Sequence, residues 1–155
     1  MEYEGVDSGG EVATIGVMNR VNTVSKDILA RAMAQEDITV IHSADTPSAY
    51  FDTETRTLCL PIWKDMDNAE YDMLVGHEVS HALNTPADGW QGWIGEDNQS
   101  GIRHMFLNIV EDARIERMIK DKFPGLRRDF ADAYKSLHAR DLFELGGKDI
   151  NSMPL

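Results

Sequence analysis

Apolar residues recur at intervals of three and four along several stretches of the chain, and this spacing predicts helices. Between residues 16 and 35 the recurring positions are Val17, Val21, Val24, Ile28, Leu29 and Ala32. A second pattern begins at Asn68, a residue type that can cap a helix, and is ended by Pro86. Two more helices are expected over residues 100–122 and from about 126 to 142.

Short β-branched and apolar runs between the first two helices predict strands. The segment DITVIHS, residues 37–43, is one of them, and SAYFDTETRTLCLP, residues 48–61, has two apolar runs around a polar turn, which is typical of a hairpin. The fold class expected is α+β: a compact, mostly helical domain with a small antiparallel β-sheet. We place it at residues 16–145, between a loose Gly-rich lead-in, 1–15, and a C-terminal tail, 146–155.

Composition narrows the classes of protein that the chain can belong to. Its 155 residues, 42% hydrophobic and 27% charged, suit one soluble domain. The formal charge of −12 argues against binding to nucleic acid or an anionic membrane, which needs clustered Lys and Arg. The acidic N-terminus is unlike a signal peptide and there is no long apolar run, so a cytoplasmic location is expected. The single cysteine, Cys59, excludes an internal disulfide and a cysteine-based zinc cage.

The segment VGHEVSHALNTP, Val75–Pro86, places two histidines four residues apart. Residues at i and i+4 of a helix lie on the same face, so His77 and His81 can direct their imidazoles at one point. Glu78 lies about a hundred degrees around the helix from His77. At this position it can reach a water bound to the metal but is poorly placed to be a third ligand. The HExxH pattern is therefore typical of zinc hydrolases whose glutamate is the general base.

Catalytic zinc usually has three protein ligands and one open position, so a third ligand must come from elsewhere in the chain. The segment NIVEDARIER, residues 108–117, carries three carboxylates on a predicted helix. We predict Glu111 as the third ligand, with Asp112 as the competing assignment, and Asp112 or Glu116 as the acceptor of the other N–H of a ligand imidazole. Zinc is the metal expected, although manganese, cobalt and iron also accept such ligands. The alternative interpretation of the segment is a solvated charged face.

Some residues near these motifs have two interpretations each. The aromatic segment 87–101, ADGWQGWIGEDNQSG, either lines the site or is a surface loop. His104 is either structural or a further polar group of the site, and Tyr134 could donate to a tetrahedral intermediate if its helix folds over the cleft. His42 has no supporting neighbours in the sequence, so a surface or packing role is expected.

The segments HEVSHALNTP and LNIVEDARIERMIKDKFPG together resemble the zincin-type metallopeptidases of tailed bacteriophages, which are often joined to a von Willebrand A-like region. The resemblance covers about residues 72–145. It implies a gluzincin site with His77, His81 and Glu111 as zinc ligands and Glu78 as base, in the host cytoplasm if the protein is encoded by a phage. The family pattern also has an acidic residue four positions after the ligand glutamate, where this chain has Ile115.

The function expected is therefore zinc-dependent hydrolysis of peptide bonds, with Glu78 as the general base. An extended protein or peptide substrate would pair with the strand around residues 58–60. The alternative is a non-catalytic, zinc-stabilised binding or regulatory module that acts on a host or viral partner protein, with a von Willebrand A-like region as a possible partner. An intact HExxH disfavours this alternative, because a purely structural zinc site has no need of Glu78.

Overall fold

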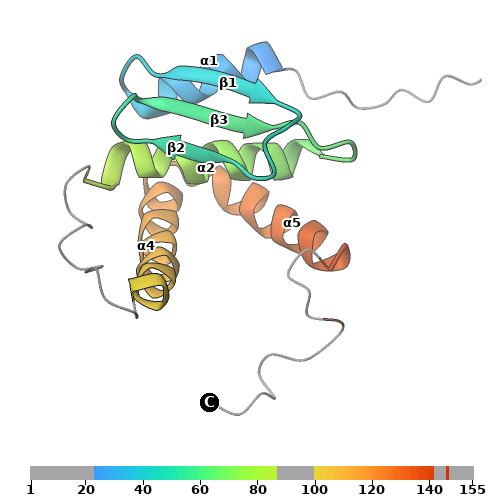
Figure 1. Ribbon diagram of the computed structural model, residues 1–155. Coiled ribbons are helices and arrows are strands. Elements are labelled where there is room, and N and C mark those ends of the chain that lie inside the picture. Colours follow the sequence, from blue (N-terminus) through green and yellow to red (C-terminus); the bar gives the residue numbers. More distant parts are fainter. Residues whose placement is uncertain (1–22, 87–99, 142–145, 147–155) are drawn as a thin grey trace, which may run out of the picture.

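A small sheet, two helices against one of its faces and two further helices beyond them form the described part of the chain (Figure 1). The computed structural model describes residues 23–86, 100–141 and 146. Its elements are α1 (Thr23–Ala34), β1 (Thr39–Ser43), β2 (Tyr50–Asp52), β3 (Thr57–Pro61), α2 (Asn68–Asn84), α4 (Ser100–Lys122) and α5 (Leu126–Ala139). The fold is thus mixed α+β and mostly helical, as predicted.

The predicted helices agree with the observed ones to within a few residues wherever the chain is described. The helix expected over residues 16–35 corresponds to α1, and the one expected to reach residue 142 ends at Ala139. The lead-in and the Trp-bearing segment, residues 87–99, lie outside the described residues, as does most of the tail. No helix within the described ranges is both long and apolar enough to cross a membrane.

The sheet is mixed, and the expectation of an antiparallel sheet is wrong for one of its two pairings. The predicted hairpin is present, with β2 antiparallel to β3, but β1 pairs with β3 in parallel. The chain passes from β1 to the far edge, where it forms β2, and returns between them as β3, which gives the order β1-β3-β2. The apolar pattern of a single strand does not encode the direction of its neighbour, so this pairing could not be read from the sequence.

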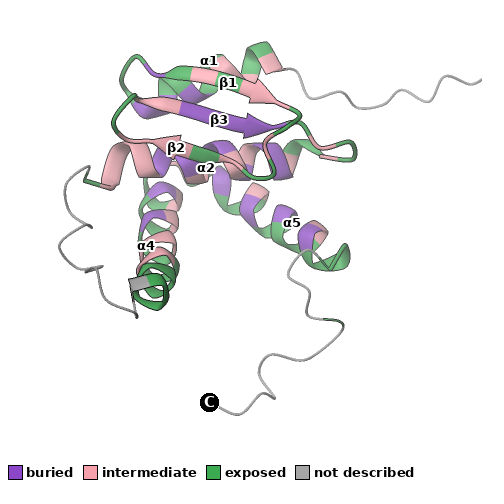
Figure 2. Cartoon of the chain, in the orientation of Figure 1, coloured by how far each residue is buried: buried purple, intermediate pink, exposed green. Residues whose placement is uncertain are grey.

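One face of the sheet packs against α1 and α2. His42 on β1 contacts Asp27 of α1 and Tyr71 of α2 through its two ring nitrogens, at 2.5 Å in each case. On the opposite face Ile41 is 46% exposed. Because side chains alternate between the faces of a strand, one part of the core lies between the sheet and these two helices. The core continues between α2 and the helices beyond it, and Figure 2 shows buried segments on α4 and α5 as well.

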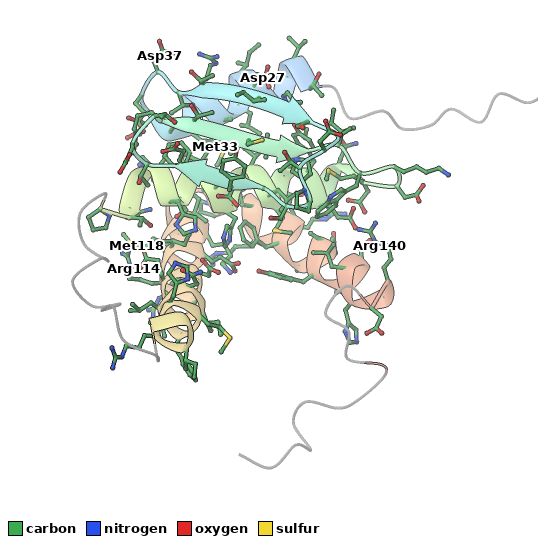
Figure 3. All side chains as sticks on the ribbon, viewed as in Figure 1. Asp27, Met33, Asp37, Arg114, Met118 and Arg140 are labelled. Atoms are coloured by element: carbon green, nitrogen blue, oxygen red, sulfur yellow. The ribbon has the colours of Figure 1, made fainter. Side chains whose placement is uncertain are left out.

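The capping residue of α2 lies one position earlier than its sequence suggested. The capping residue is Asp67, not Asn68: its carboxylate accepts the backbone N–H of Glu70, and the Glu70 carboxylate accepts the backbone N–H of Asp67. This reciprocal capping box satisfies two N–H groups that the first turn leaves without partners. Glu70 is fully buried and also pairs with Arg140, which follows α5 (Figure 3).

Helices α4 and α5 lie on the side of α2 that faces away from the sheet (Figure 1). A Cβ atom on Gly76 of α2 would lie 3.0 Å from Leu126 and 3.2 Å from Phe130, so the missing side chain lets α5 approach closely. The buried hydroxyl of Ser80 donates to the carbonyl oxygen of Ile115 at 2.7 Å and joins α2 to α4. Both small residues lie next to the HExxH histidines in the sequence.

The N-terminal half of α4 extends beyond these contacts. Five of its large apolar side chains are more than half exposed, and we call them the apolar face of α4: Ile102, Met105, Phe106, Ile109 and Val110. Farther along the same helix Ile115 and Ile119 are fully buried. Helix α4 is therefore anchored by its second half, where the carboxylates of the NIVEDARIER segment also lie.

Candidate metal centre

The two histidines of the HExxH motif lie on successive turns of α2, with ring centroids 5.1 Å apart. Their Nε2 atoms both face Asp112 on α4: the Oδ1 atom of Asp112 lies 3.6 Å from Nε2 of His77 and 3.4 Å from Nε2 of His81. These three donor atoms come within 4.8 Å of one another and form a group able to hold a metal ion. The crossing of α2 and α4 thus brings together residues that are more than thirty positions apart.

The geometry of the group fits a zinc ion. Zinc–nitrogen and zinc–oxygen bonds of roughly 2.0–2.1 Å at tetrahedral angles separate neighbouring donor atoms by about 3.4 Å. Both distances from the Asp112 oxygen to the imidazole nitrogens are close to this value. Two imidazoles and one carboxylate would leave the fourth tetrahedral position of an ion open to water. Three protein ligands with one open position are typical of catalytic zinc sites, whereas structural zinc sites have four protein ligands.

The outer nitrogen of His77 is held by Glu116, one turn beyond Asp112 on α4. Nδ1 of His77 lies 3.2 Å from the Glu116 carboxylate, which also accepts hydrogen bonds from Tyr134 of α5 and, at 3.1 Å, from Lys120. Burial acts to raise the pKa of Glu116, but the three hydrogen bonds outweigh it and hold that pKa at about 2. Glu116 is therefore ionised and can only accept, so Nδ1 of His77 carries the proton.

His77 itself is affected by the acidic groups around it. Burial acts to lower the pKa of its imidazole, but the hydrogen bond to Glu116 and the charges of Glu78 and Asp112 outweigh burial and raise the pKa. Without a metal, this site therefore favours a positive charge on His77. A cation among these carboxylates is favoured for the same electrostatic reason.

Glu111, the ligand that the sequence favoured, is held away from the histidine nitrogens by other partners. Both of its carboxylate oxygens accept hydrogen bonds from Arg114, at 2.6 and 2.7 Å, and one of them also accepts from Thr85 at 2.6 Å. The hydrogen bond from Arg114 is the main cause that lowers the pKa of Glu111. Figure 3 shows Arg114 on the part of α4 that approaches α2. The structure thus brings Asp112, the competing assignment, to the two histidines.

Glu78 lies between α2 and the edge strand β2. Its side chain is buried, with 6% of its area exposed, and it accepts a hydrogen bond from the backbone of Phe51 on β2. Burial is the largest effect on this carboxyl and raises its pKa, while the nearby imidazoles of His77 and His81 act to lower it. A carboxyl with a raised pKa beside two imidazoles that could bind a metal suits a group that accepts a proton and returns it.

Three further residues have positions that their sequence context did not fix. His104 is exposed on α4, with its ring 3.4 Å from the Asn108 amide, and is not part of the group that could hold a metal ion. Tyr134 donates to Glu116, which in turn binds His77, so the contact of Tyr134 with the site is indirect. Of the two roles expected for His42, the structure shows the packing role, since its ring links α1, β1 and α2.

Comparisons of this chain with protein-family models, with curated proteins and with solved structures find no match.

Proposed function

We propose that this protein is a zinc-dependent peptidase of the zincin type, with His77, His81 and Asp112 as metal ligands and Glu78 as the general base. The observation that carries the proposal is that both imidazoles are tied at Nδ1, by Glu116 and by Thr85, while both Nε2 atoms face the same carboxylate oxygen. Ligand histidines in metal sites characteristically have their second nitrogen bound in this way. An unrelated pair of surface histidines has no reason to share such an arrangement.

A zinc ion in this group would polarise a scissile carbonyl and lower the pKa of a water toward neutrality. The carboxylate of Glu78 then takes the proton of the attacking water and passes it to the leaving amine. Its buried position beside β2 keeps it away from bulk solvent, and its raised pKa favours the step in which it takes the proton from water. Glu116 and Thr85 keep the imidazoles in place during these steps.

An extended substrate would align along β2 rather than along the strand around residues 58–60. Leu58 and Cys59 are flanked on both sides, by β1 and by β2, so the expectation of a free edge there is wrong. Among the described strands β2 is the one beside Glu78, and it has β3 on one side only. An added strand at this edge would place a peptide bond next to the general base without reading its side chains.

The test is hydrolysis of a peptide library by the purified protein, followed by mass spectrometry. We expect cleavage by the zinc-loaded protein, loss of cleavage after a chelator, and recovery when zinc is returned. Cleavage that persists after the metal has been removed would contradict the proposal. The new termini of the products would also reveal the side-chain preference around the cleaved bond.

The second candidate is a zinc-stabilised module that binds or regulates a partner protein without turnover. The exposed apolar face of α4 favours it, because contiguous apolar surface commonly marks a contact with another protein. This candidate predicts that zinc binds and stabilises the fold while no peptide in the library is cleaved. It also predicts that substitution of Glu78 leaves partner binding unchanged.

A further inference from the structure

A chain of hydrogen bonds runs from His81 through the end of α2 to α4. Nδ1 of His81 lies 2.9 Å from the hydroxyl of Thr85, and that hydroxyl donates to Glu111 at 2.6 Å. Arg114 donates to both oxygens of Glu111 and, at 2.8 Å, to the backbone carbonyl of Asn84. Thr85 and Glu111 thus lie between a candidate metal ligand and a cation that holds the end of α2.

The direction of each proton in this chain follows from the chemistry of its members. A guanidinium can only donate, so Arg114 fixes Glu111 as an acceptor. A hydroxyl has one hydrogen, and that of Thr85 points to Glu111, so toward His81 the hydroxyl oxygen can only accept. Nδ1 of His81 must then carry the imidazole proton, which leaves the lone pair on Nε2, the atom 3.4 Å from Asp112.

We propose that Thr85 and Glu111 are positioning residues that hold His81 in the tautomer protonated at Nδ1, with its Nε2 lone pair directed at the metal position. The inference rests on the proposed function only in taking zinc as the ion that Nε2 binds. It gives Glu111 a role other than ligand. It also extends the functional unit of α2 beyond the HExxH motif to the fourth residue after the second histidine.

A purely structural role has to be separated from this one, because the backbone N–H of Thr85 also donates to the carbonyl oxygen of His81 at 3.0 Å at the end of α2. The informative variant is Thr85→Val, which keeps the side-chain shape and the backbone bond but removes the hydroxyl. Thr85→Ser restores the hydroxyl. Thr39→Val is the matched control, since Thr39 is exposed on β1, at the edge of the sheet opposite β2.

The first measurement is the tautomer of His81 in the metal-free protein, from long-range ¹H–¹⁵N NMR spectra at a pH where imidazoles are neutral. We expect the Nδ1–H form in the wild type, in Thr85→Ser and in Thr39→Val. In Thr85→Val we expect the Nε2–H form to become populated. The second measurement is zinc affinity by competition with a chelating dye, and we expect a loss of about 10- to 100-fold in Thr85→Val and recovery in Thr85→Ser.

Glu111→Ala tests the same chain without changing Thr85. It removes both carboxylate oxygens, so the hydroxyl of Thr85 loses the acceptor that fixes the direction of its proton. The hydroxyl of Thr85 is then free to donate to His81. We expect the same change of tautomer and a similar loss of zinc affinity, even if Thr85→Val does not fold.

The inference is overturned if His81 has the same tautomer and the protein the same zinc affinity in the wild type and in folded Thr85→Val or Glu111→Ala. It is also overturned if the wild-type imidazole is protonated at Nε2. A wild type that holds His81 in the Nδ1–H form but shows no peptidase activity would contradict the proposed function alone. The two proposals can therefore fail separately.

Discussion

Nε2 of His81 lies 3.4 Å from Oδ1 of Asp112, while Glu111, one position earlier on the same helix, points to Arg114 and Thr85. Consecutive residues of an α-helix are turned by about 100°, so two neighbouring carboxylates cannot face the same target. The Asp112 choice also places Glu116 four residues later, on the same face, where it binds the other histidine. A single orientation of α4 therefore directs Asp112 at the Nε2 atoms of the histidines and Glu116 at Nδ1 of His77.

The ligand assignment predicts different behaviour for two adjacent substitutions. Asp112→Ala removes one of three donors, and we expect the protein to lose its zinc during purification. Glu111→Ala leaves all three donors and removes only an outer contact, so zinc should remain at about one per chain with affinity lowered by about 10- to 100-fold. Elemental analysis of both variants beside the wild type decides the question, and the reverse pattern would return Glu111 to the ligand position.

The general base can be separated from the metal by Glu78→Gln. The amide has nearly the same shape but cannot accept the proton of the attacking water, so peptide hydrolysis should fall by at least about 10²- to 10⁴-fold while zinc stays bound. Zinc content and cleavage of the best library peptide are measured on the same preparation. Turnover at the wild-type rate in this variant would refute the mechanism.

The close approach of α5 to α2 predicts opposite effects of the same substitution at two helical glycines. At Gly76 a new methyl group meets Leu126 and Phe130, and overpacking of about 1–3 kcal/mol should exceed the gain in helix propensity of about 1 kcal/mol. At Gly101 no atom of the described residues lies within 4 Å of the new methyl group, so only the propensity gain remains. Urea unfolding should therefore show Gly76→Ala below the wild type and Gly101→Ala at or above it. Equal shifts in the two variants would argue against the tight α2–α5 contact.

The ionised state of Glu116 predicts an acid-dependent contribution to the stability of the metal-free protein. Its pKa of about 2 lies below the ordinary value of 4.5, so the contribution is complete above pH 4.5 and is lost as the pH falls toward 2. Glu116→Gln lacks this contribution. The difference in unfolding free energy between wild type and variant should therefore shrink by about 1–2 kcal/mol between pH 5 and pH 3. Urea unfolding with a chelator present measures it, and a constant difference would contradict the prediction.

The elements of this fold could largely be predicted because their signals are local. The apolar periodicities of α2 and α4, the polar turn between β2 and β3, and the pair His77 and His81 all depend on residues within two or three turns of one another. Asp67 was missed as the cap because Asp67 and Asn68 are adjacent and both suit that position.

The arrangement of the elements could not be predicted in the same way. The parallel pairing of β1 and the choice between Glu111 and Asp112 depend on how distant segments meet, and periodicity along one element does not report it. One signal did bear on the ligand: Glu116 lies four residues after Asp112, whereas Ile115 stands four after Glu111 and is fully buried in the structure. The position of Glu116 therefore pointed to Asp112, the residue that the structure brings to the histidines, whereas the family pattern pointed to Glu111.

The hydrogen bond from Ser80 to the carbonyl oxygen of Ile115 joins residues 35 positions apart, right beside the histidines and Asp112. A peptide containing only α2 would carry both imidazoles but not the carboxylate of Asp112, so the complete set of three donors exists only in the folded chain. An ion bound here would then act as a cross-link that closes a long loop, much as a disulfide does. A protein with a single cysteine would have in this site a removable cross-link between the two longest helices of its described residues.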